Sequence, residues 1–501
     1  MEEQEKTQLQ TERSHYRSSF AATLLFSGVQ LYQIFIRIIR SKFVALFIGP
    51  GGMGITSLLR STTDTISAAT NLGLNTSSVK TISAANREGD LAHIARNVKA
   101  QRRLILLTGI IGTLICAILA PFWSQVSFGN SDYIWAFVIV SIIVLLDQLN
   151  KGELALLQGL QQKKQLARAN IIGQTLNAVI TIPLYYFFGV KAIVAALVLG
   201  SMLSLTISLY FSRRIEVKRI QMSWKETFSI GHEMIKLGFF LSLQFLMASI
   251  VMWIIRNYVS SVGGVDDVGL YSAGTTIITT YIGLVFSAIA TDYFPRLAAT
   301  KGNKEMGIAV RTQAELTILL LAPLAVAFLL FCRPVIILLY SEKFLPIEHM
   351  MYWSVGGVLV QAMGWAMSHT LLAKAKPSYF FLNEFFAAIL GLPIKLYFYK
   401  NWGLTGFGMA TALVYLLYLV QVLFVTKKLF DLSYEKKLWG LSLLLYIPVL
   451  LIVMIKLYLP LIISYVIGIV ILFLTCYLVF LRLDKKIGIK EIIIAKFGHR
   501  N

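Results

Sequence analysis

Long apolar runs recur along the whole of this 501-residue chain. About 20 apolar residues suffice for a helix to cross a bilayer. Hydrophobic residues make up 57% of the chain and charged residues only 14%, too few to cover soluble domains of this length. We therefore predict an all-α integral membrane protein with about 14 transmembrane helices. The predicted spans lie near residues 19–48, 53–83, 101–122, 133–158, 166–188, 190–212, 233–258, 267–295, 312–340, 348–373, 378–399, 403–427, 438–458 and 460–482.

Basic residues are distributed unevenly between the two sides of these spans. If the N-terminus lies inside, 33 of the 46 lysines and arginines fall in cytoplasmic segments and nine within spans. The other four are in outside loops, at Lys191, Lys343, Lys400 and Lys456. This asymmetry follows the positive-inside rule and predicts that both termini are cytoplasmic. The net charge of +21 thus reflects topology and attraction to membrane lipids, and no nucleic-acid partner is expected.

The sequence also contains an internal repeat with an offset of about 215 residues. Four pairs of positions match: Gly54-Ile55 with Gly269-Leu270, Arg96 with Arg311, Leu156-Leu157 with Leu371-Leu372, and Gly189-Val190 with Gly403-Leu404, the last one residue out of step. The repeat predicts two six-helix lobes related by a pseudo-two-fold axis along the membrane normal, followed by a C-terminal helical hairpin. The expected domains are residues 1–228, 229–430 and 431–501, with the basic segment 213–232 as the linker.

Polar residues within the spans recur at intervals of three, four or seven, which places them on one face of a helix. An arginine or lysine at the bilayer centre costs about 2.5–3.5 kcal/mol. We therefore predict that these faces line a water-filled cationic vestibule between the lobes. The polar faces comprise Gln30, Gln33, Arg37 and Arg40 on the first span, Ser57, Arg60, Asp64, Ser67, Asn71, Asn75 and Ser78 on the second, Asp147, Lys151 and Gln158 on the fourth, and Ser242, Ser249 and Arg256 on the seventh.

An anionic, hydrophilic headgroup is the ligand that such a vestibule predicts, because the arginine fork matches phosphate oxygens. The candidate substrate-binding residues are Arg60, Arg256, Arg37, Arg40 and Lys42. An alternative interpretation concerns Arg37, Arg40, Lys42 and Arg256 above all, and Arg60 less because it lies deeper. The first four can be read as interfacial residues. They lie near outer helix ends, where long basic side chains reach the membrane interface.

Three further residues are candidates either for ion coupling or for structural ion pairs. Asp64 and Asp147 are carboxylates within predicted spans, and a buried carboxylate can carry a coupling proton. The spacing also predicts ion pairs between residues i and i+4, namely Arg60 with Asp64 and Asp147 with Lys151.

Cofactor and metal sites are not indicated. The three cysteines, Cys116, Cys332 and Cys476, all lie in apolar runs far from one another, and the six histidines are scattered. Neither pattern has the spacing of a metal-ligand set. No cofactor is therefore expected, and no enzyme motif appears.

Several segments resemble the MOP exporter superfamily, and within it the Wzx-type O-antigen and enterobacterial-common-antigen translocases. Lys42, Arg60 and Arg256 fall on basic positions of that pattern, whereas Arg37 and Arg40 do not. The segments that carry the resemblance are RSKFVALFIGPGGMGITSLLRS (40–61), SFGNSDYIWAFVIV (127–140), IIRNYVSSVGGVDDVGLY (254–271), and SEKFLPIEHMMYW with LLAKAKPSYFFLNEF within 341–385.

The resemblance implies a flippase for undecaprenyl-diphosphate-linked oligosaccharide, acting in O-antigen and lipopolysaccharide synthesis. It would move this substrate from the inner to the outer leaflet of the bacterial inner membrane by alternating access. A coupling cation (H⁺ or Na⁺), membrane lipids and polysaccharide polymerase machinery are the expected partners of a monomeric transporter. The alternatives are a lipid II flippase and a MATE-like drug/cation antiporter of the same superfamily. An excess of arginine over carboxylate argues against a cationic cargo.

Overall fold

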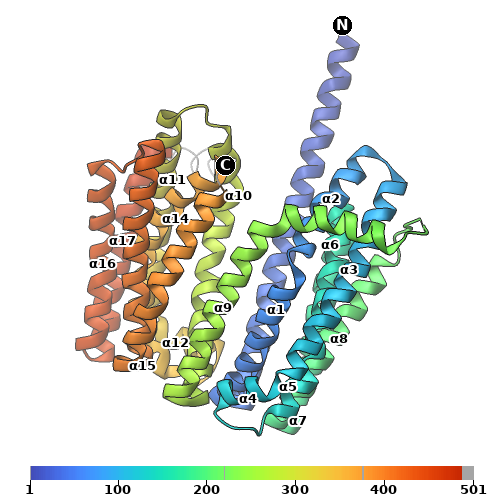
Figure 1. The fold of residues 1–501 in the computed structure, drawn as a ribbon. Coiled ribbons are helices and arrows are strands. Elements are labelled where there is room, and N and C mark those ends of the chain that lie inside the picture. The colour runs from blue at the N-terminus through green and yellow to red at the C-terminus, as the bar shows by residue number, and fades with distance from the viewer. Residues whose placement is uncertain (1, 219, 375–376, 488–501) are drawn as a thin grey trace, which may run out of the picture. The chain divides into compact units, whose positions relative to one another are not determined.

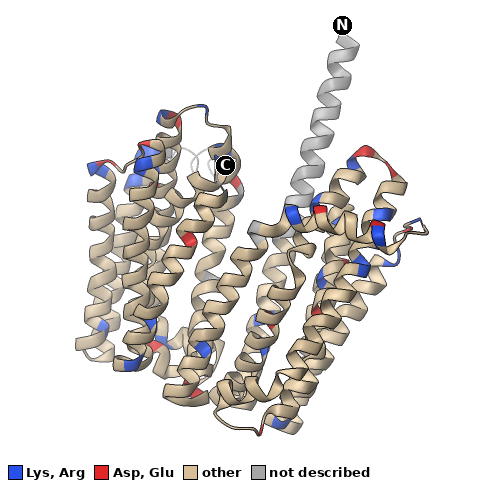
Figure 2. Cartoon of the chain, viewed as in Figure 1, with Lys and Arg blue, Asp and Glu red and all other residues tan. Residues whose placement is uncertain are grey.

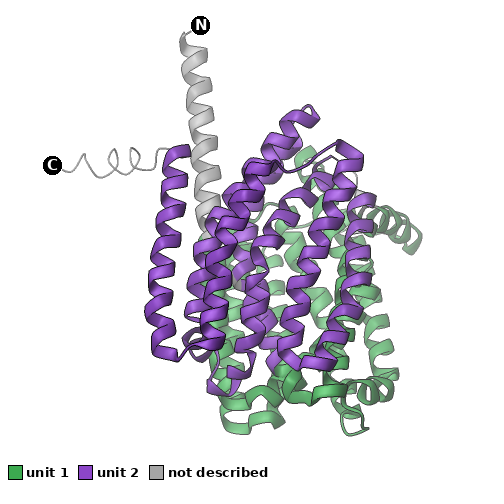
Figure 3. Ribbon diagram, turned by 90° about the vertical axis from the view of Figure 1, so that its left-hand side faces the viewer, with its two compact units in different colours: residues 1–269 green, residues 270–501 purple. Residues whose placement is uncertain are grey.

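The computed structural model describes residues 2–218, 220–374 and 377–487. Every regular element in these ranges is a helix, as the sequence predicts (Figure 1). The chain divides into two compact units, residues 1–269 and 270–501, coloured separately in Figure 3. The boundary between the units falls within one long helix, α9 (Trp224–Thr276).

The described residues of unit 1 form eight α-helices, a short 3-10 turn and the first part of α9. Its elements are α1 (Glu2–Asn71), α2 (Leu74–Glu88), α3 (Leu91–Ile118), α4 (Ala120–Phe128), α5 (Ile134–Val140), α6 (Ile142–Gly159), α7 (Lys163–Phe188), η1 (Gly189–Ala192) and α8 (Ile193–Ser212).

Unit 2 follows the same order of long and short helices and then adds two more. After the end of α9 come the π-helical turn η2 (Ile277–Ile282), α10 (Gly283–Ala299), α11 (Asn303–Leu330), α12 (Cys332–Leu339), η3 (Glu342–Ile347), α13 (Glu348–Gly356), α14 (Val358–Ala373) and α15 (Pro377–Phe430). The two added helices are α16 (Lys436–Tyr458) and α17 (Leu461–Ile487).

Eight helical segments of the described chain are long and apolar enough to cross a membrane. Three of them, Lys163–Ser212, Ser242–Ala299 and Ser378–Phe430, contain 50, 58 and 53 residues. Each is therefore long enough for two crossings of about 20 residues. A multi-pass helical membrane protein is confirmed, while the count of fourteen spans and the arrangement of two lobes stay predictions.

Glycines interrupt the long helices at equivalent places. Gly49, Gly264 and Gly403 have φ values of 64°, 84° and 56° within α1, α9 and α15, and Gly189 has a φ of 55° where α7 ends. Glycine adopts such positive φ values without the steric cost that a Cβ atom brings. Gly49 and Gly264 are 215 residues apart, which is the offset of the sequence repeat. The kink of α1 at Gly49 thus lies between the first and second predicted spans, near residues 19–48 and 53–83.

The kinked parts of α1 and α9 touch each other within unit 1. A Cβ atom on Gly54 would overlap the carbonyl oxygen of Val265, and one on Gly269 would overlap the carbonyl oxygen of Pro50. Val265 and Gly269 are the repeat equivalents of Pro50 and Gly54, so the contact is reciprocal. Absence of a side chain at both glycines is what lets the two backbones approach so closely.

The basic segment between α8 and α9 is shorter than the sequence predicts. Ser223 begins α9 with a capping box: its backbone N–H donates to Glu226 Oε2 at 2.8 Å, and the Glu226 N–H donates to Ser223 Oγ at 3.2 Å. The bond from the Ser223 N–H lowers the pKa of the Glu226 carboxyl. Residues 224–232, which the sequence assigns to the linker, are therefore helical.

The apolar core of unit 1 fixes the orientation of α1. Leu58 and Leu59 are fully buried, and Leu59 packs in a cluster with Phe137 of α5 and Ile193 of α8. Arg60, the next residue, keeps 37% of its side chain exposed. Burial of the two leucines thus directs the Arg60 side chain away from this cluster.

Candidate functional site

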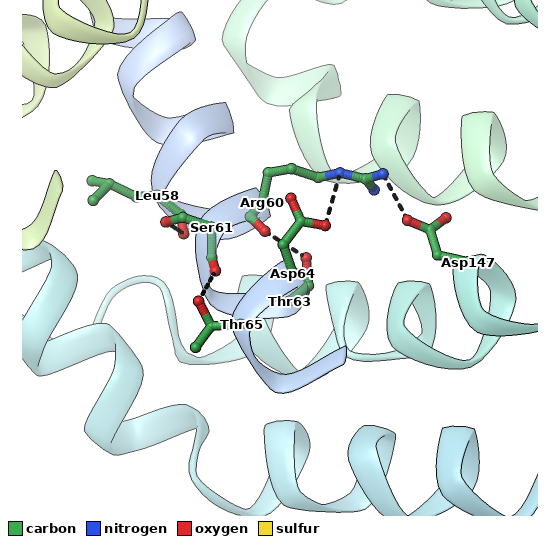
Figure 4. A network of polar contacts seen from close by, with 7 residues as sticks. All are labelled: Leu58, Arg60, Ser61, Thr63, Asp64, Thr65 and Asp147. Carbon is green, nitrogen blue, oxygen red and sulfur yellow. Dashed lines mark hydrogen bonds and ion pairs between the residues drawn. The ribbon is translucent and has the colours of Figure 1, made fainter. Parts of the chain in front are cut away.

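Arg60 on α1 lies between two carboxylates (Figure 4). Its Nη2 donates a 2.6 Å hydrogen bond to Asp147 Oδ2 on α6, and its Nε lies 3.8 Å from Asp64 Oδ1, one turn further along α1. Asp147 keeps only 10% of its side chain exposed, whereas Asp64 keeps 47%. The predicted contact of Arg60 with Asp64 is therefore present. The structure adds a bond from Arg60 to Asp147 on another helix, which the spacing along the sequence did not indicate.

The charges of this group are unequal, with one guanidinium facing two carboxylates. Removing the cation would leave the nearly buried Asp147 without its partner, which is costly in a low-dielectric interior. Asp64 is the more exposed and more distant carboxylate, so its contact is the weaker one. An anionic ligand that reached Arg60 would compete first with Asp64.

A polar cavity of about 460 Å³ lies beside this group in unit 1. It is bounded by the second half of α1, the start of α2, α6 and α9. Its lining residues are Asp64, Ser67, Ala68, Asn71, Gly73, Asn75, Thr76, Lys151, Ser242, Phe245 and Ser249. Polar residues that the sequence placed on the second, fourth and seventh spans thus meet around one space.

Helix α1 breaks at the cavity wall. Leu72 and Gly73 have positive φ values of 52° and 78°, and α2 begins at Leu74. Beside the break, Asn75 N donates to Asn71 Oδ1 at 3.3 Å. Asn71 Nδ2 and Asn75 Oδ1 are buried and make no hydrogen bond within the described part of the chain. Buried polar atoms of this kind bind water or a ligand in most proteins.

Helix α9 is held against α1 by hydrogen bonds across the helix pair. Trp253 Nε1 donates to Thr62 Oγ1 at 3.1 Å, and Thr65 Oγ1 donates to the Ser249 carbonyl oxygen at 3.2 Å. At the break of α1, Gly73 lies against Gly238, where a Cβ atom on either glycine would come within 2.8 Å of the other's carbonyl oxygen. These contacts position the α9 face that completes the cavity.

The other predicted basic residues do not line this cavity. Arg37 is exposed on α1, while Arg40 and Lys42 are partly buried. Arg40 interacts electrostatically with Arg60. Arg256 on α9 is partly buried, and its Nε makes no hydrogen bond among the described residues. Lys151, by contrast, lines the cavity together with Asp64.

The sequence pattern did not indicate four lining residues, Ala68, Gly73, Thr76 and Phe245. Ala68 follows Asp64 by four residues, but it is apolar and so was not part of the polar pattern. Phe245 follows Ser242 by three residues, so the helical spacing that marked the serine could have found it. Gly73 and Thr76 come after the end of α1 at Asn71. The break interrupts the helical period there, so counting along α1 does not predict which later residues share its polar face. The predicted ion pair of Asp147 with Lys151 is absent from the described residues, because Asp147 binds Arg60 instead.

The described residues contain no group of three or more His, Cys, Asp or Glu side chains that could hold a metal ion. The cavity lining contributes one carboxylate, one ammonium group, and hydroxyl and amide groups. Such a lining can hydrogen-bond water, sugar hydroxyls or a small ion.

Residues 43–349 match the model of a family described as polysaccharide biosynthesis proteins. The chain belongs to this family.

Two relatives are also similar in sequence to this chain. A putative O-antigen transporter of Shigella flexneri is 26% identical over 218 residues, covering 43% of this chain and 51% of that protein. The lipid III flippase of Escherichia coli K12 is 18% identical over 366 residues, 72% of this chain and 87% of that protein. The match thus spans about half the length of the first relative.

Two solved structures share the fold of this family member. The lipid II flippase MurJ in an inward closed conformation aligns with a TM-score of 0.67 and 12% identity, covering 93% of this chain and 99% of that one. An inward-facing multidrug resistance MATE family transporter of the MOP superfamily aligns with a TM-score of 0.65 and 15% identity, covering 82% and 98%. The fold is therefore that of MOP-type transporters.

Proposed function

We propose that this protein is a transporter, not an enzyme, that moves undecaprenyl-diphosphate-linked oligosaccharide from the inner to the outer leaflet of the bacterial inner membrane. The observation that carries the proposal is the polar cavity of about 460 Å³ within a bundle of apolar helices. A glycan needs hydroxyl and amide partners to enter a membrane protein, and the cavity offers them. The family and its lipid-flipping relatives support the substrate class.

The diphosphate would bind to basic residues of α1 and α9. Arg60, Arg40, Arg37, Lys42 and Arg256 are the proposed set. In this scheme the diphosphate replaces Asp64 at Arg60, while Asp147 holds the other side of the guanidinium in place. The prenyl tail stays in the lipid, because only the charged and sugar parts require a polar environment.

Alternating access would follow from the repeat. The proposed moving parts are the lobes 1–228 and 229–430, with the hairpin 431–501 attached to the second lobe and both termini cytoplasmic. A coupling cation, H⁺ or Na⁺, would bind Asp64 when the substrate takes Arg60 from it. Polysaccharide polymerase machinery is the proposed downstream partner of the monomeric flippase.

Deletion of the gene, followed by extraction of prenyl-diphosphate glycans, tests the proposal. We expect a complete repeat unit to accumulate on the cytoplasmic leaflet, where an added impermeant glycosidase cannot reach it in intact spheroplasts. Accumulated lipid II would instead establish the lipid II flippase. Unchanged lipid-linked glycans together with increased sensitivity to cationic drugs would establish the antiporter. The experiment is needed because the structures of the lipid II flippase and of the multidrug resistance transporter align with this chain about equally well.

A further inference from the structure

A second cavity of about 460 Å³ lies in unit 1 between the start of α3 and the segment that connects α8 to α9. We call it the linker cavity. Its lining consists of Ala95, Val98, Lys99, Arg102, Arg103, Val217, Lys218 and Ile220. None of these residues lines the cavity beside Arg60, so the two spaces are separate.

The connecting segment is fastened to α3 by basic side chains. Lys99 Nζ donates to the Ile220 carbonyl oxygen, and Arg103 Nη1 donates to the Met222 carbonyl oxygen at 2.8 Å. The Arg103 guanidinium also lies over the Trp224 ring, 5.0 Å from its centroid. The capping box at the start of α9 fixes the far end of the segment. The linker cavity therefore has defined walls on both sides.

Positive charge exceeds negative charge around the linker cavity. Of its four basic residues, Arg102 is paired with Glu153, through bonds of 2.8 and 2.7 Å. Lys99 donates to a neutral carbonyl oxygen, and Arg103 donates to a carbonyl oxygen and to the Thr227 hydroxyl. Neither forms an ion pair with a carboxylate among the described residues. Lys218 is exposed and makes no hydrogen bond or ion pair with the described residues. Three cations thus remain available to an anion.

The rest of the lining is apolar. The cavity lies beside the basic first part of α3, just before the residues of this helix become mainly apolar. Basic residues of unit 1 gather at this end of its helices, around α2 and the start of α3 (Figure 2). The charge distribution predicts that this end is cytoplasmic. A ligand here would have an anionic group for the cations and an apolar part for Val98, Val217 and Ile220.

We propose that the linker cavity binds the phosphodiester headgroup of an anionic phospholipid of the cytoplasmic leaflet. Basic pockets at the cytoplasmic ends of transmembrane helices suit such headgroups, and charge-assisted bonds to phosphate are among the strongest hydrogen bonds. The headgroup bridges α3 and the connecting segment, beside the carbonyl anchors that already join them. This site is independent of the transported substrate.

Native mass spectrometry of the purified full-length protein, titrated with phosphatidylglycerol or phosphatidylcholine, tests the proposal. We expect phosphatidylglycerol to bind at least about fivefold more tightly. Lys218→Gln removes a charge without breaking an observed contact, so the connecting segment keeps its anchors. It should weaken phosphatidylglycerol binding about fivefold, the effect of one cation near a membrane surface. The double variant Lys99→Gln/Lys218→Gln should weaken it further.

Arg96→Gln is the matched control, because Arg96 is an exposed cation of α3 outside the lining. Equal binding of the two lipids, or equal weakening by Arg96→Gln and Lys218→Gln, would overturn the proposal. Displacement of phosphatidylglycerol by inorganic phosphate at the same concentration would also overturn it, in favour of a soluble phosphate compound. None of these measurements depends on export, so failure here leaves the proposed function untouched.

Discussion

Arg60 donates a 2.6 Å hydrogen bond to Asp147, a residue 87 positions further along the chain and on another helix. The bond joins α1 to α6 at the edge of the polar cavity, and Asp64 adds a second, looser contact at 3.8 Å. The same guanidinium is thus both a link between two helices and a basic group beside the cavity, in contact with the lining residue Asp64. Variants can separate these two roles.

Arg60→Ala should abolish export while the protein still inserts and accumulates. Arg60→Lys should be only partly tolerated, because an ammonium group lacks the planar fork that binds two oxygens at once. Surface polysaccharide and the amount of membrane-inserted protein are the two measurements, with Lys80→Ala, an exposed cation of α2, as the control. Normal polysaccharide in Arg60→Ala would remove Arg60 from the site.

The double variant Arg60→Ala/Asp147→Asn distinguishes a structural from a binding role. It removes the nearly buried carboxylate that the single variant leaves unpaired, so stability in detergent should recover relative to Arg60→Ala. Export should remain absent, because the basic group is still missing. Recovery of export would mean that Arg60 serves only to neutralise Asp147.

Arg256→Ala should also abolish export without reducing the amount of protein in the membrane. The Nε atom of Arg256 is buried and makes no hydrogen bond among the described residues, so its loss breaks no observed bond at that atom. Arg256→Lys keeps the charge and should retain part of the activity. Export assays on both variants check this expectation, and wild-type export by Arg256→Ala would contradict it.

Much of the fold was predictable because it depends on local chemistry. Long apolar runs predict helices, and the 215-residue repeat anticipates the paired kinks at Gly49 and Gly264. The helical period also predicts which polar residues of α1 share a face. These properties follow from residues near one another in sequence, or from an offset that self-comparison detects.

The partners of the site residues were less predictable. Spacing along one helix indicates Asp64 as a partner of Arg60, but not Asp147, since pairing across helices depends on how α1 and α6 pack. Spacing likewise suggests that Asp147 pairs with Lys151, whereas Lys151 lies at the cavity. The break at Gly73 interrupts the period, so Thr76 could not be placed by counting.

Gly54→Ala and Gly269→Ala should each destabilise the protein by about 1–3 kcal/mol, the usual cost of overpacking. A methyl group at either position would overlap a backbone carbonyl oxygen across the helix pair. Because the contact is reciprocal, the two variants should behave alike. Thermal unfolding in detergent measures the effect. Gly440→Ala is the control, because Gly440 lies in α16 with open space around it. This variant should keep the stability of the wild-type protein.

Thiol labelling should reveal the polar cavity directly. In a variant whose three cysteines are replaced by serine, Ser249→Cys and Ser67→Cys should react with a small charged methanethiosulfonate reagent, because both positions line a polar space that water can fill. Ala167→Cys, buried in α7 at 4% exposure, should react at least about tenfold more slowly.

The labelling rate is measured by mass spectrometry of the intact protein after reaction in membranes. No reaction at either serine position would mean that the reagent does not enter this cavity from water. Equal reaction rates at all three positions would mean that the cavity is no more accessible than the buried core. An added prenyl-diphosphate glycan should slow labelling of Ser67→Cys, since it would occupy the space beside Arg60.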